Sequence, residues 1–413
     1  MKLAFNYIGL FFLANFILSC SSPAANNVAV QKQEIAGLNT EHVFETQDTL
    51  LQKGDGLLFS MDIPVSGRYR VEVRVKTVAA AVTVWLEDYI HNTDDRTYNV
   101  TGDLTFDAQK LSAAKDGSPF KEGKHDMRLN VSEGSVEIEA VKFTLLKEHT
   151  PTPTQYQQNM SGKKWRLVWS DEFEGTGLPD TAKWDYNRGN WGWGNNELQY
   201  YTEHQQKNAR LADGNLIIEA HKNKASGEWT SARLTTQGKA SFLYGKIEFR
   251  AKVPTGRGTW AAGWFLGDDY VDELSWPYCG EIDVLECVGF EINDTTGNGI
   301  NHATCHTRSY YFKQGNQIGS DIVVENMNKD FHTYAIEWYP YEIKAFVDGK
   351  HYYTYDKNAD ELEWPFNKSQ NIVINLAIGG GWGGAKGMDS NLISPQYILD
   401  YVRVYETTNT DAE

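Results

Sequence analysis

Short segments of alternating hydrophobic and polar residues run along most of this 413-residue chain. A period of two is typical of β-strands that bury one face, and clusters of Gly, Asn and Asp separate the segments. We expect strands at 68–75, 82–86, 136–143, 216–220, 246–252, 333–338, 343–347, 372–378 and 401–405. The dipeptide Asp348-Gly349 predicts a tight hairpin turn. The pattern therefore predicts an all-β protein whose larger part is a β-jelly-roll sandwich of two antiparallel sheets.

The expected strands fall into two units joined by a polar stretch. We predict a smaller β-sandwich domain over 34–148 and a larger domain over 164–406. Residues 149–163 between them are rich in Pro, Thr and Gln, which is typical of an extended linker. The sequence therefore predicts two domains, followed by a polar tail.

The first twenty residues predict export. A short basic start precedes a mostly apolar stretch over 3–18, which is too short to span a membrane comfortably. Residues 1–20 are therefore expected to be a cleaved signal peptide. The letters ILSC, ending at Cys20, resemble a bacterial lipoprotein box, which predicts a lipid on Cys20 and attachment to the outer membrane, on its periplasmic or outer face. Ordinary secretion, with Cys20 discarded, is the alternative.

Composition narrows the classes of partner. The formal net charge is −16, and the chain has 13 Trp, 22 Tyr and 36 Gly. This charge repels polyphosphate and anionic surfaces, so we expect no nucleic-acid partner and no membrane contact other than the lipid anchor. An uncharged ligand is not repelled, and aromatic faces suit sugars. We expect a monomer.

Three cysteines remain after export, at Cys279, Cys287 and Cys305. An odd number cannot all form intramolecular pairs, and their spacing does not resemble a metal site. The sequence leaves two alternatives open: buried thiols, or one disulfide of unknown connectivity.

Residues 280–288, GEIDVLECV, place three carboxylates within six positions of an otherwise apolar strand. Side chains alternate between the two faces of a strand, so Glu281 and Asp283 share one face. Glu286 comes one position late for that face. A β-bulge between Asp283 and Glu286 would return it to the other two acids. We therefore expect a row of three carboxylates beside a bulge.

Such a row suits a retaining glycosidase. That chemistry needs two carboxyl groups about 5 to 5.5 Å apart, one to attack the sugar and one to protonate the leaving oxygen. We assign Glu281 as the nucleophile and Glu286 as the acid/base, with Asp283 holding Glu281 through a shared proton. Spacing alone leaves the order of the two roles open.

Two other interpretations of the acidic strand are an edge strand with solvated acids and a calcium cage. The neighbouring segments favour catalysis on a glycan, because they are crowded with aromatic and amide side chains that suit sugar faces and hydroxyls. These residues are the segment 191–197, Trp260, Trp264 and Trp276.

Further motifs follow one another through the larger domain, at 168–173, 195–202, 230–234, 280–286, 303–307, 331–338 and 375–384. Together they resemble glycoside hydrolase family 16, in its laminarinase-like branch. The resemblance covers 164–406 and implies a retaining endo-hydrolase with an open cleft across the concave sheet of a jelly roll. It implies the same roles for Glu281, Asp283 and Glu286, without a cofactor for catalysis.

The resemblance also implies residues that bind sugar. On matching positions these are Asn196, Arg233, Trp260, Trp264 and His306, and the aromatic context adds Trp276. A core role is the alternative for each tryptophan, and His306 is expected to donate or accept hydrogen bonds rather than act as a base. Gly263 stands where the family has a bulky residue, which predicts more room beside Trp264.

A structural calcium ion on the convex side is a further implication of the resemblance. The matching positions are Glu172, Gly214 and Asp400, whose side-chain and carbonyl oxygens are ligands of the right hardness. A turn-capping role for Asp400 is the alternative.

The smaller unit resembles a carbohydrate-binding module through residues 63–71 and 136–145. The alternative is a plain spacer sandwich with Trp85 and Tyr89 in its core.

For the substrate we expect a laminarin-type β-1,3-glucan, because an acidic protein without a basic cleft disfavours highly sulfated galactans. Mixed-linkage β-1,3-1,4-glucan and agar-type galactan are the alternatives. A protein of a different class, a non-catalytic glycan-binding surface lipoprotein, would normally have lost one of the three carboxylates.

Overall fold

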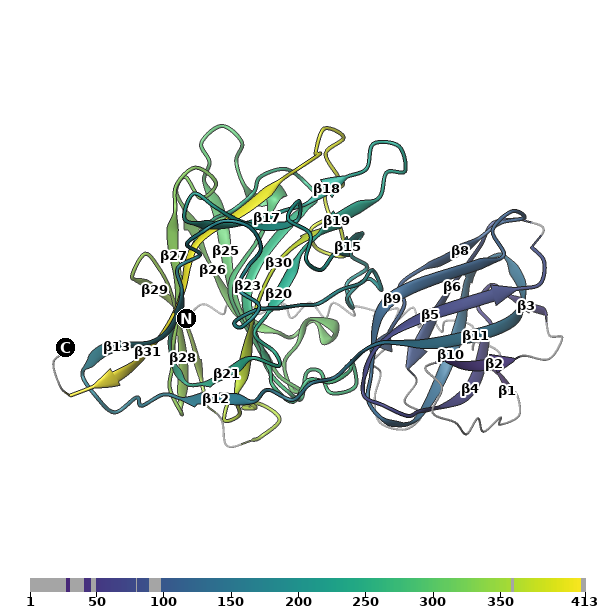
Figure 1. Cartoon of the computed structure of the whole chain (residues 1–413), viewed down its shortest axis with the longest axis horizontal. Coiled ribbons are helices and arrows are strands. Elements are labelled where there is room, and N and C mark those ends of the chain that lie inside the picture. The colour runs from purple at the N-terminus through teal and green to yellow at the C-terminus, as the bar shows by residue number, and fades with distance from the viewer. Residues whose placement is uncertain are drawn as a thin grey trace, which may run out of the picture.

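The computed structural model describes residues 27–29, 41–45, 50–78, 80–88, 98–357 and 360–409. The expected signal peptide and Cys20 lie outside these residues. The described chain is all-β, as predicted, and Figure 1 shows a smaller unit containing β1 to β11 beside a larger one. Its only helical elements are the 3-10 turns η1 (Gly289–Glu291) and η2 (Phe312–Gln314). In this part of the chain, no helix has the length and apolar character needed to cross a membrane.

The smaller unit packs two sheets around one apolar core. The first sheet contains β1 (Asn27–Ala29), β4 (Gly56–Ile63), β6 (Val82–Asp88), β7 (Tyr98–Asn99), β8 (Leu104–Phe106) and β10 (Gly123–Glu133). The second contains β2 (Glu41–Glu45), β3 (Leu50–Gln52), β5 (Gly67–Val75), β9 (Ser112–Phe120) and β11 (Ser135–Glu148). Val82, Val84 and Leu86 of β6 belong to the core, whereas Trp85 between them is half-buried and lies outside it. Tyr89 lies outside the described residues.

The larger unit stacks a nine-stranded sheet against an eight-stranded sheet, which is the predicted sandwich. The nine-stranded sheet contains β12 (Thr154–Gln157), β14 (Asp185–Tyr186), β20 (Arg233–Thr235), β21 (Ala240–Leu243), β23 (Thr259–Gly267), β24 (Glu281–Val288), β25 (Gly299–His306), β26 (Ile318–Val324) and β30 (Gln370–Ile378). The eight-stranded sheet contains β13 (Lys164–Asp171), β16 (Ala209–Ala212), β17 (Asn215–Glu219), β22 (Gly245–Lys252), β27 (His332–Trp338), β28 (Glu342–Val347), β29 (Lys350–Asp356) and β31 (Gln396–Thr408). A third, small sheet contains β15 (Gln199–Tyr201), β18 (His221–Lys222) and β19 (Trp229–Ser231).

The predicted strands coincide with observed ones to within a few residues at their ends. β22, for example, shows the alternating burial that its sequence predicted. The hairpin between β28 and β29 turns at Asp348 and Gly349, whose φ angles are 48° and 76°. Part of the expected linker 149–163 is itself a strand, because β12 pairs in parallel with β21. This pairing ties the chain to the larger unit before β13 begins.

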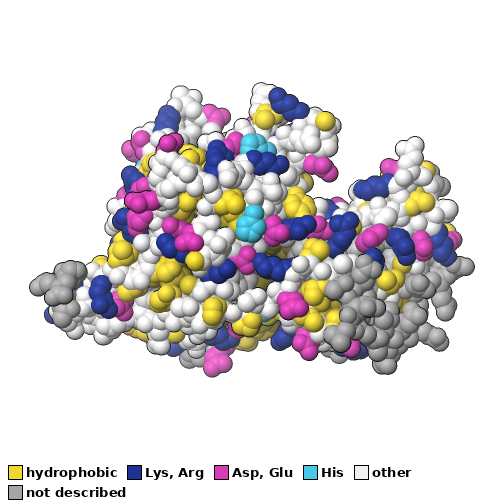
Figure 2. Space-filling model, in the orientation of Figure 1, with side chains coloured by type: hydrophobic (Ala, Val, Ile, Leu, Met, Phe, Trp, Pro, Cys, Tyr) yellow, Lys and Arg dark blue, Asp and Glu magenta, His cyan; other side chains and the backbone are white. Residues whose placement is uncertain are grey.

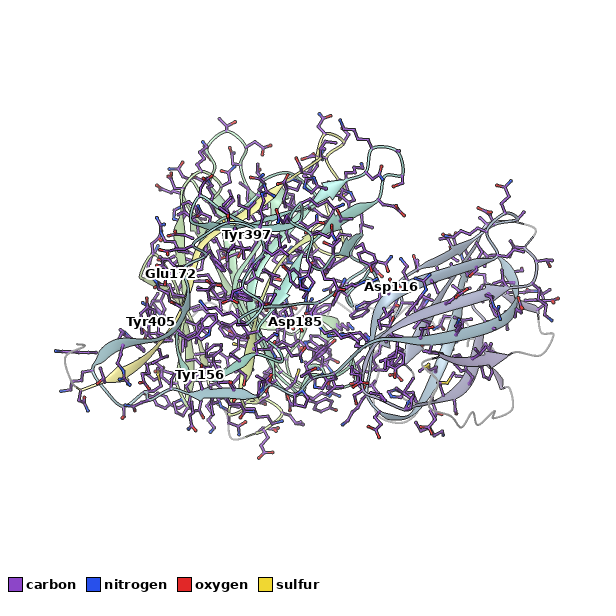
Figure 3. The ribbon with its side chains drawn as sticks, viewed as in Figure 1. Asp116, Tyr156, Glu172, Asp185, Tyr397 and Tyr405 are labelled. Atoms are coloured by element: carbon purple, nitrogen blue, oxygen red, sulfur yellow. The ribbon has the colours of Figure 1, made fainter. Side chains whose placement is uncertain are left out.

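Asp116 of β9 is the centre of the contact between the two units, and Figure 3 places it at their junction. Its backbone N–H donates to Asn190 Oδ1 at 2.9 Å, and the Asn190 N–H donates to its carbonyl at 3.0 Å. Its carboxylate accepts the Tyr200 hydroxyl at 3.0 Å and lies 3.6 Å from Arg188. The neighbouring glycines touch: a Cβ on Gly117 would stand 2.2 Å from the Arg188 carbonyl oxygen. These contacts fix the smaller unit in one position.

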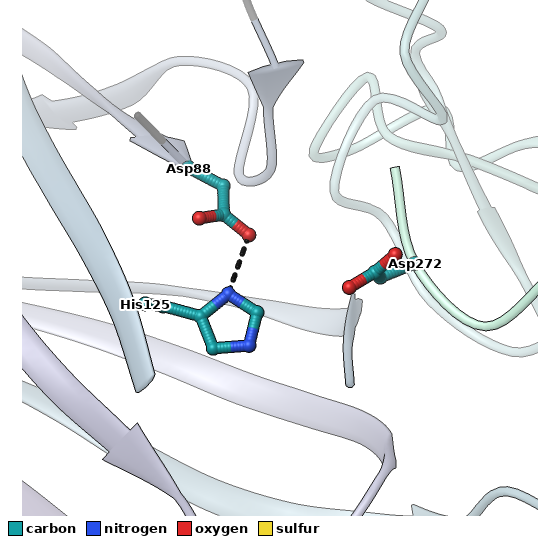
Figure 4. A group of neighbouring side chains, drawn as sticks. All are labelled: Asp88, His125 and Asp272. Atoms are coloured by element: carbon teal, nitrogen blue, oxygen red, sulfur yellow. Dashed lines mark hydrogen bonds and ion pairs between the residues drawn. The ribbon is translucent and has the colours of Figure 1, made fainter. Parts of the chain in front are cut away.

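A buried histidine strengthens the same junction, as Figure 4 shows. His125 Nδ1 lies 2.8 Å from Asp88 Oδ2, and its Nε2 lies 2.7 Å from the Lys121 carbonyl oxygen. Asp272 of the larger unit completes the cluster and accepts the Lys121 N–H at 3.2 Å. Burial lowers the pKa of His125, but the hydrogen bond and charge of Asp88, with the Lys121 carbonyl and the Asp272 charge, outweigh it and raise the pKa to about 9. Because both ring nitrogens face oxygen acceptors, the group is an imidazolium that joins the units and does not offer a lone pair to a metal ion.

The three cysteines of the described chain, Cys279, Cys287 and Cys305, are buried free thiols. Burial raises the pKa of each thiol. Of the two alternatives that the sequence left open, the structure therefore has buried thiols and not a disulfide.

Candidate active site

A cleft crosses the nine-stranded sheet, and the three acids of β24 line it together. In the pairing of β23 with β24, Gly263 stands opposite Leu285, and the next residue, Trp264, stands opposite Asp283. Val284 has no partner on β23 and is therefore an extra residue on the acidic strand. This is the predicted β-bulge. It shifts the alternation by one position, and Glu286 therefore reaches the cleft that Glu281 and Asp283 also line.

Two tryptophan indoles hold the outer acids. The Trp276 Nε1–H donates to Glu281 Oε2 at 2.9 Å, and the Trp260 Nε1–H donates to Glu286 Oε1 at 3.0 Å. Each hydrogen bond fixes the direction of a carboxyl group and stabilises its ionised form. The cleft thus positions one carboxyl group on each side of the bulge.

Burial dominates the proton affinity of all three acids. Burial and the charge of Glu286 raise the pKa of Glu281 to about 8, although the Trp276 hydrogen bond opposes them. Burial raises the pKa of Glu286 to about 7, and burial with the two glutamate charges raises that of Asp283 well above its usual range. The row therefore retains protons at neutral pH, as expected for adjacent carboxyl groups.

His306 lies against the acids but stays uncharged. Its Nε2 is 3.4 Å from Asp283 Oδ2 and 3.8 Å from Glu281 Oε1. Burial lowers the pKa of His306 to about 4, so the neutral imidazole contributes no positive charge near pH 7. His306 lies one strand away from the acids, on β25, and its role as a hydrogen-bonding neighbour rather than a base stays a prediction.

The remaining predicted sugar-binding residues divide into two places. Trp260, Trp264 and Arg233 line the cleft with the acids, and the Arg233 guanidinium lies 4.7 Å from the ring centres of both Trp193 and Trp264. Asn196 does not line the cleft that contains the acids; it is exposed and lines an adjoining groove toward the smaller unit.

The expectation of extra room beside Trp264 is wrong. Gly263 faces the core rather than the cleft, because side chains alternate along β23. A Cβ at this position would stand 3.1 Å from the Phe249 ring. The absent side chain therefore accommodates Phe249 and leaves the sugar side of the sheet unchanged.

Sequence reasoning assigned no role to several polar groups of the cleft. Asn375 accepts the Trp264 Nε1–H at 2.8 Å and donates to the Tyr201 hydroxyl at 3.0 Å. Its signal in the sequence is a single amide inside the otherwise apolar segment 372–378. Glu273 also lines the cleft and accepts the Tyr270 hydroxyl at 2.8 Å, and it lies in a loop without any strand pattern.

The residues expected to hold calcium do not fit a calcium cage as they stand. Both Glu172 carboxylate oxygens accept hydrogen bonds from Arg403, at 3.0 and 2.7 Å, and Asp400 pairs with Arg250. Gly214 adopts a φ of 72°. Because guanidinium groups already neutralise both acids, calcium stays a prediction and no step of the chemistry is built on it.

A cleft of this kind, with acids on its floor and indoles around them, defines the class of the protein as a carbohydrate-cleaving hydrolase. The family model of glycosyl hydrolases family 16 matches residues 195–402, and the chain belongs to that family. The chain is therefore a glycoside hydrolase.

Individual proteins to which the chain is similar are also glycoside hydrolases. The chain is 49% identical over 249 residues to a beta-glucanase from Rhodothermus marinus, covering 58% of this chain and 85% of that protein. It is 34% identical to glucan endo-1,3-beta-glucosidase A1 from Niallia circulans, covering 58% of this chain and 38% of that protein. The solved laminarinase from Rhodothermus marinus superposes with a TM-score of 0.56 at 48% identity, covering 60% of this chain and 99% of the other.

Proposed function

We propose that this enzyme hydrolyses internal β-1,3-glucosidic bonds of laminarin-type glucans and retains the anomeric configuration. The observation that carries the proposal is the bulge at Val284, which gives one cleft two glutamates with different partners. The similarity to a beta-glucanase and a laminarinase supports the substrate class.

In the first step the Glu281 carboxylate attacks the anomeric carbon and forms a glycosyl ester. Glu286 gives its proton to the glycosidic oxygen as the bond between that oxygen and the anomeric carbon breaks. In the second step Glu286 takes a proton from water, the water oxygen attacks the anomeric carbon, and the Glu281 carboxylate leaves. Asp283, buried between them, adjusts the charge of Glu281.

The pKa of Glu281, about 8, and that of Glu286, about 7, do not decide which glutamate attacks, and the order of the two roles rests on the resemblance of the motif to the family. One proton shared by the two glutamates supplies both the ionised attacking group and the protonated acid. The Trp276 N–H stabilises negative charge on Glu281, and the Trp260 N–H does the same for Glu286. Glycosidases depend on such a pair of environments for two identical side chains.

A neutral glucan suits the surface of the enzyme. The net charge is −16, and Figure 2 shows acidic and basic side chains interspersed on the face in view. The test is a panel of purified laminarin, mixed-linkage β-1,3-1,4-glucan and agarose, with the products identified by size and linkage. Faster release of reducing ends from mixed-linkage glucan or agarose than from laminarin would replace the proposed substrate.

The mechanism is tested separately from the substrate. Proton NMR of the first products on laminarin is expected to show the β-anomer before mutarotation. Glu281→Gln is expected to abolish turnover while oligosaccharide binding persists. Wild-type protein that binds laminarin and cuts no glucan would indicate the non-catalytic glycan-binding class.

Export and anchoring belong to the same proposal. We infer that Cys20 carries the lipid and that the enzyme acts as a monomer at the outer membrane. Cys20→Ser is expected to release the protein into the soluble fraction and to prevent labelling by an alkynyl fatty acid. Size-exclusion chromatography with light scattering of the protein without residues 1–20 is expected to give a single chain.

A further inference from the structure

The cleft that holds the acids adjoins a groove of about 780 Å³ that residues of both units line. Gly194 and Lys313 line both spaces, so the cleft and the groove adjoin at these two residues. The Lys313 ammonium lies 5.4 Å from the ring centre of Trp276, the residue that binds Glu281, and 5.8 Å from that of Tyr98 in the smaller unit. Lys313 therefore lies between the cleft that holds the acids and the first sandwich.

The smaller unit provides an aromatic surface on this groove. Trp85, half-buried on β6, lines it together with Thr83 of the same strand and Ser132 of β10. Thr83 and Trp85 occupy the alternate face of β6 from the core residue Val84. A large ring flanked by hydroxyl groups suits the apolar face and the polar edge of a sugar.

The part of the groove that the smaller unit lines carries acidic side chains, which repel a sulfated polysaccharide but not a neutral one. Asp103 and Glu133, both exposed, line it from the smaller unit. Asn196, which the sequence predicted to bind sugar, lines it from the larger unit. Residues from both units thus converge on one surface.

The junction keeps this surface in a fixed position. The contacts of Asp116 and the buried imidazolium of His125 join the units. The Arg68 guanidinium of the smaller unit also lies 6.0 Å from the Trp193 ring and 5.6 Å from the Tyr270 ring. Because the two units are already joined, a glucan chain bound in the cleft reaches the groove without the entropic cost of ordering a tethered domain.

We propose that the smaller sandwich supplies distal sugar subsites of the catalytic cleft, with Trp85 as their aromatic platform, so that long neutral glucan chains bind across both units. This inference rests on the proposed function and deepens it. In this view the smaller sandwich is an extension of the active site and not an independent carbohydrate-binding module. Short oligosaccharides occupy only the part near the acids and do not reach Trp85.

The test compares long and short substrates with the full chain. Trp85→Ala is expected to raise KM for laminarin by about 3- to 10-fold, the effect of one lost aromatic contact. Its kcat on laminarin and its kinetics on laminaritriose are expected to stay within about twofold of wild type. Trp85→Phe should give a KM for laminarin close to the wild-type value. Trp165→Ala, at a half-buried tryptophan of β13 outside both spaces, is the matched control.

Binding gives an independent measurement. In a Glu281→Gln background, Trp85→Ala should raise the dissociation constant for laminarin by the same factor in titration calorimetry. Equal KM and equal dissociation constants for the Trp85 and Trp165 variants would overturn the inference, even where the wild type cuts laminarin normally. Wild-type protein that cuts no glucan would refute the proposed function, and the dissociation constants alone would then decide the inference.

Discussion

Replacing the proposed nucleophile is expected to stabilise the folded protein at neutral pH. The folded protein keeps a proton on Glu281 up to a pKa of about 8, whereas the same carboxyl group in the unfolded chain ionises near 4.5. A carboxyl group whose pKa rises on folding contributes its full stability below pH 4.5, and this contribution falls as the pH rises toward 8. Glu281→Gln removes this dependence because an amide does not titrate.

The size of the effect follows from the pKa. From pH 4.5 to pH 7 the wild type loses about 1.4 kcal/mol per pH unit, or about 3 kcal/mol at most. Glutamine keeps an oxygen acceptor for the Trp276 N–H, so the variant should be more stable than wild type at pH 7. For a domain of this size, each kcal/mol raises the melting temperature by roughly 2–4 °C.

Differential scanning calorimetry between about pH 4.5 and 8 measures this directly. The difference in melting temperature between Glu281→Gln and wild type should be smallest at the acidic end and grow toward neutrality. Glu325→Gln, at an exposed acid of the loop after β26, should follow wild type throughout. A variant that melts at or below the wild-type temperature at every pH would refute the reasoning.

Four shorter predictions follow from other parts of the structure. The kcat/KM on laminarin should be bell-shaped in pH with its maximum between about 7 and 8, falling on the acidic side as both glutamates bind protons and on the alkaline side as both ionise; a flat profile would contradict this. Asn375→Ala should lower the free energy of unfolding by about 1–3 kcal/mol and lower kcat/KM, because the Trp264 indole loses its acceptor, and urea unfolding with steady-state kinetics would measure both. Gly117→Ala should lower the melting temperature and open the junction to limited proteolysis, since the new methyl group would overlap the Arg188 carbonyl. EDTA should leave the melting temperature unchanged, because arginines already neutralise the two acids expected to bind calcium; a rise on adding Ca²⁺ would restore the sequence-based prediction.

The acidic strand shows what local pattern determines. Its period and the late position of Glu286 required a bulge, and the pairing of β23 with β24 contains it. The hairpin at Asp348 and Gly349 was equally predictable, because only a few dipeptides favour two positive φ angles in succession. In both cases the relevant information lies within a few consecutive residues.

Features that depend on residues far apart in the chain were not predictable in this way. Phe249, the neighbour that occupies the space beside Gly263, comes from β22 of the other sheet, and the sequence does not state that contact. The position of Asn196 depends on a neighbour from the other unit. The same applies to His125, whose aspartate partners are separated from each other by about half of the smaller unit and part of the larger one. Nothing in the local pattern of any of these residues marks the pairing.

The touching glycines at the junction carry a lesson for engineering. A Cβ on Gly189 would stand 2.1 Å from the Asp116 carbonyl oxygen, and one on Gly117 would meet Arg188 as closely. Because the two backbones approach this closely, the smaller unit fits only a neighbour with a glycine at this contact. The first sandwich is therefore not expected to dock in the same way when it is fused to another hydrolase. A chimera would have to carry the recipient loop around Gly189 along with it.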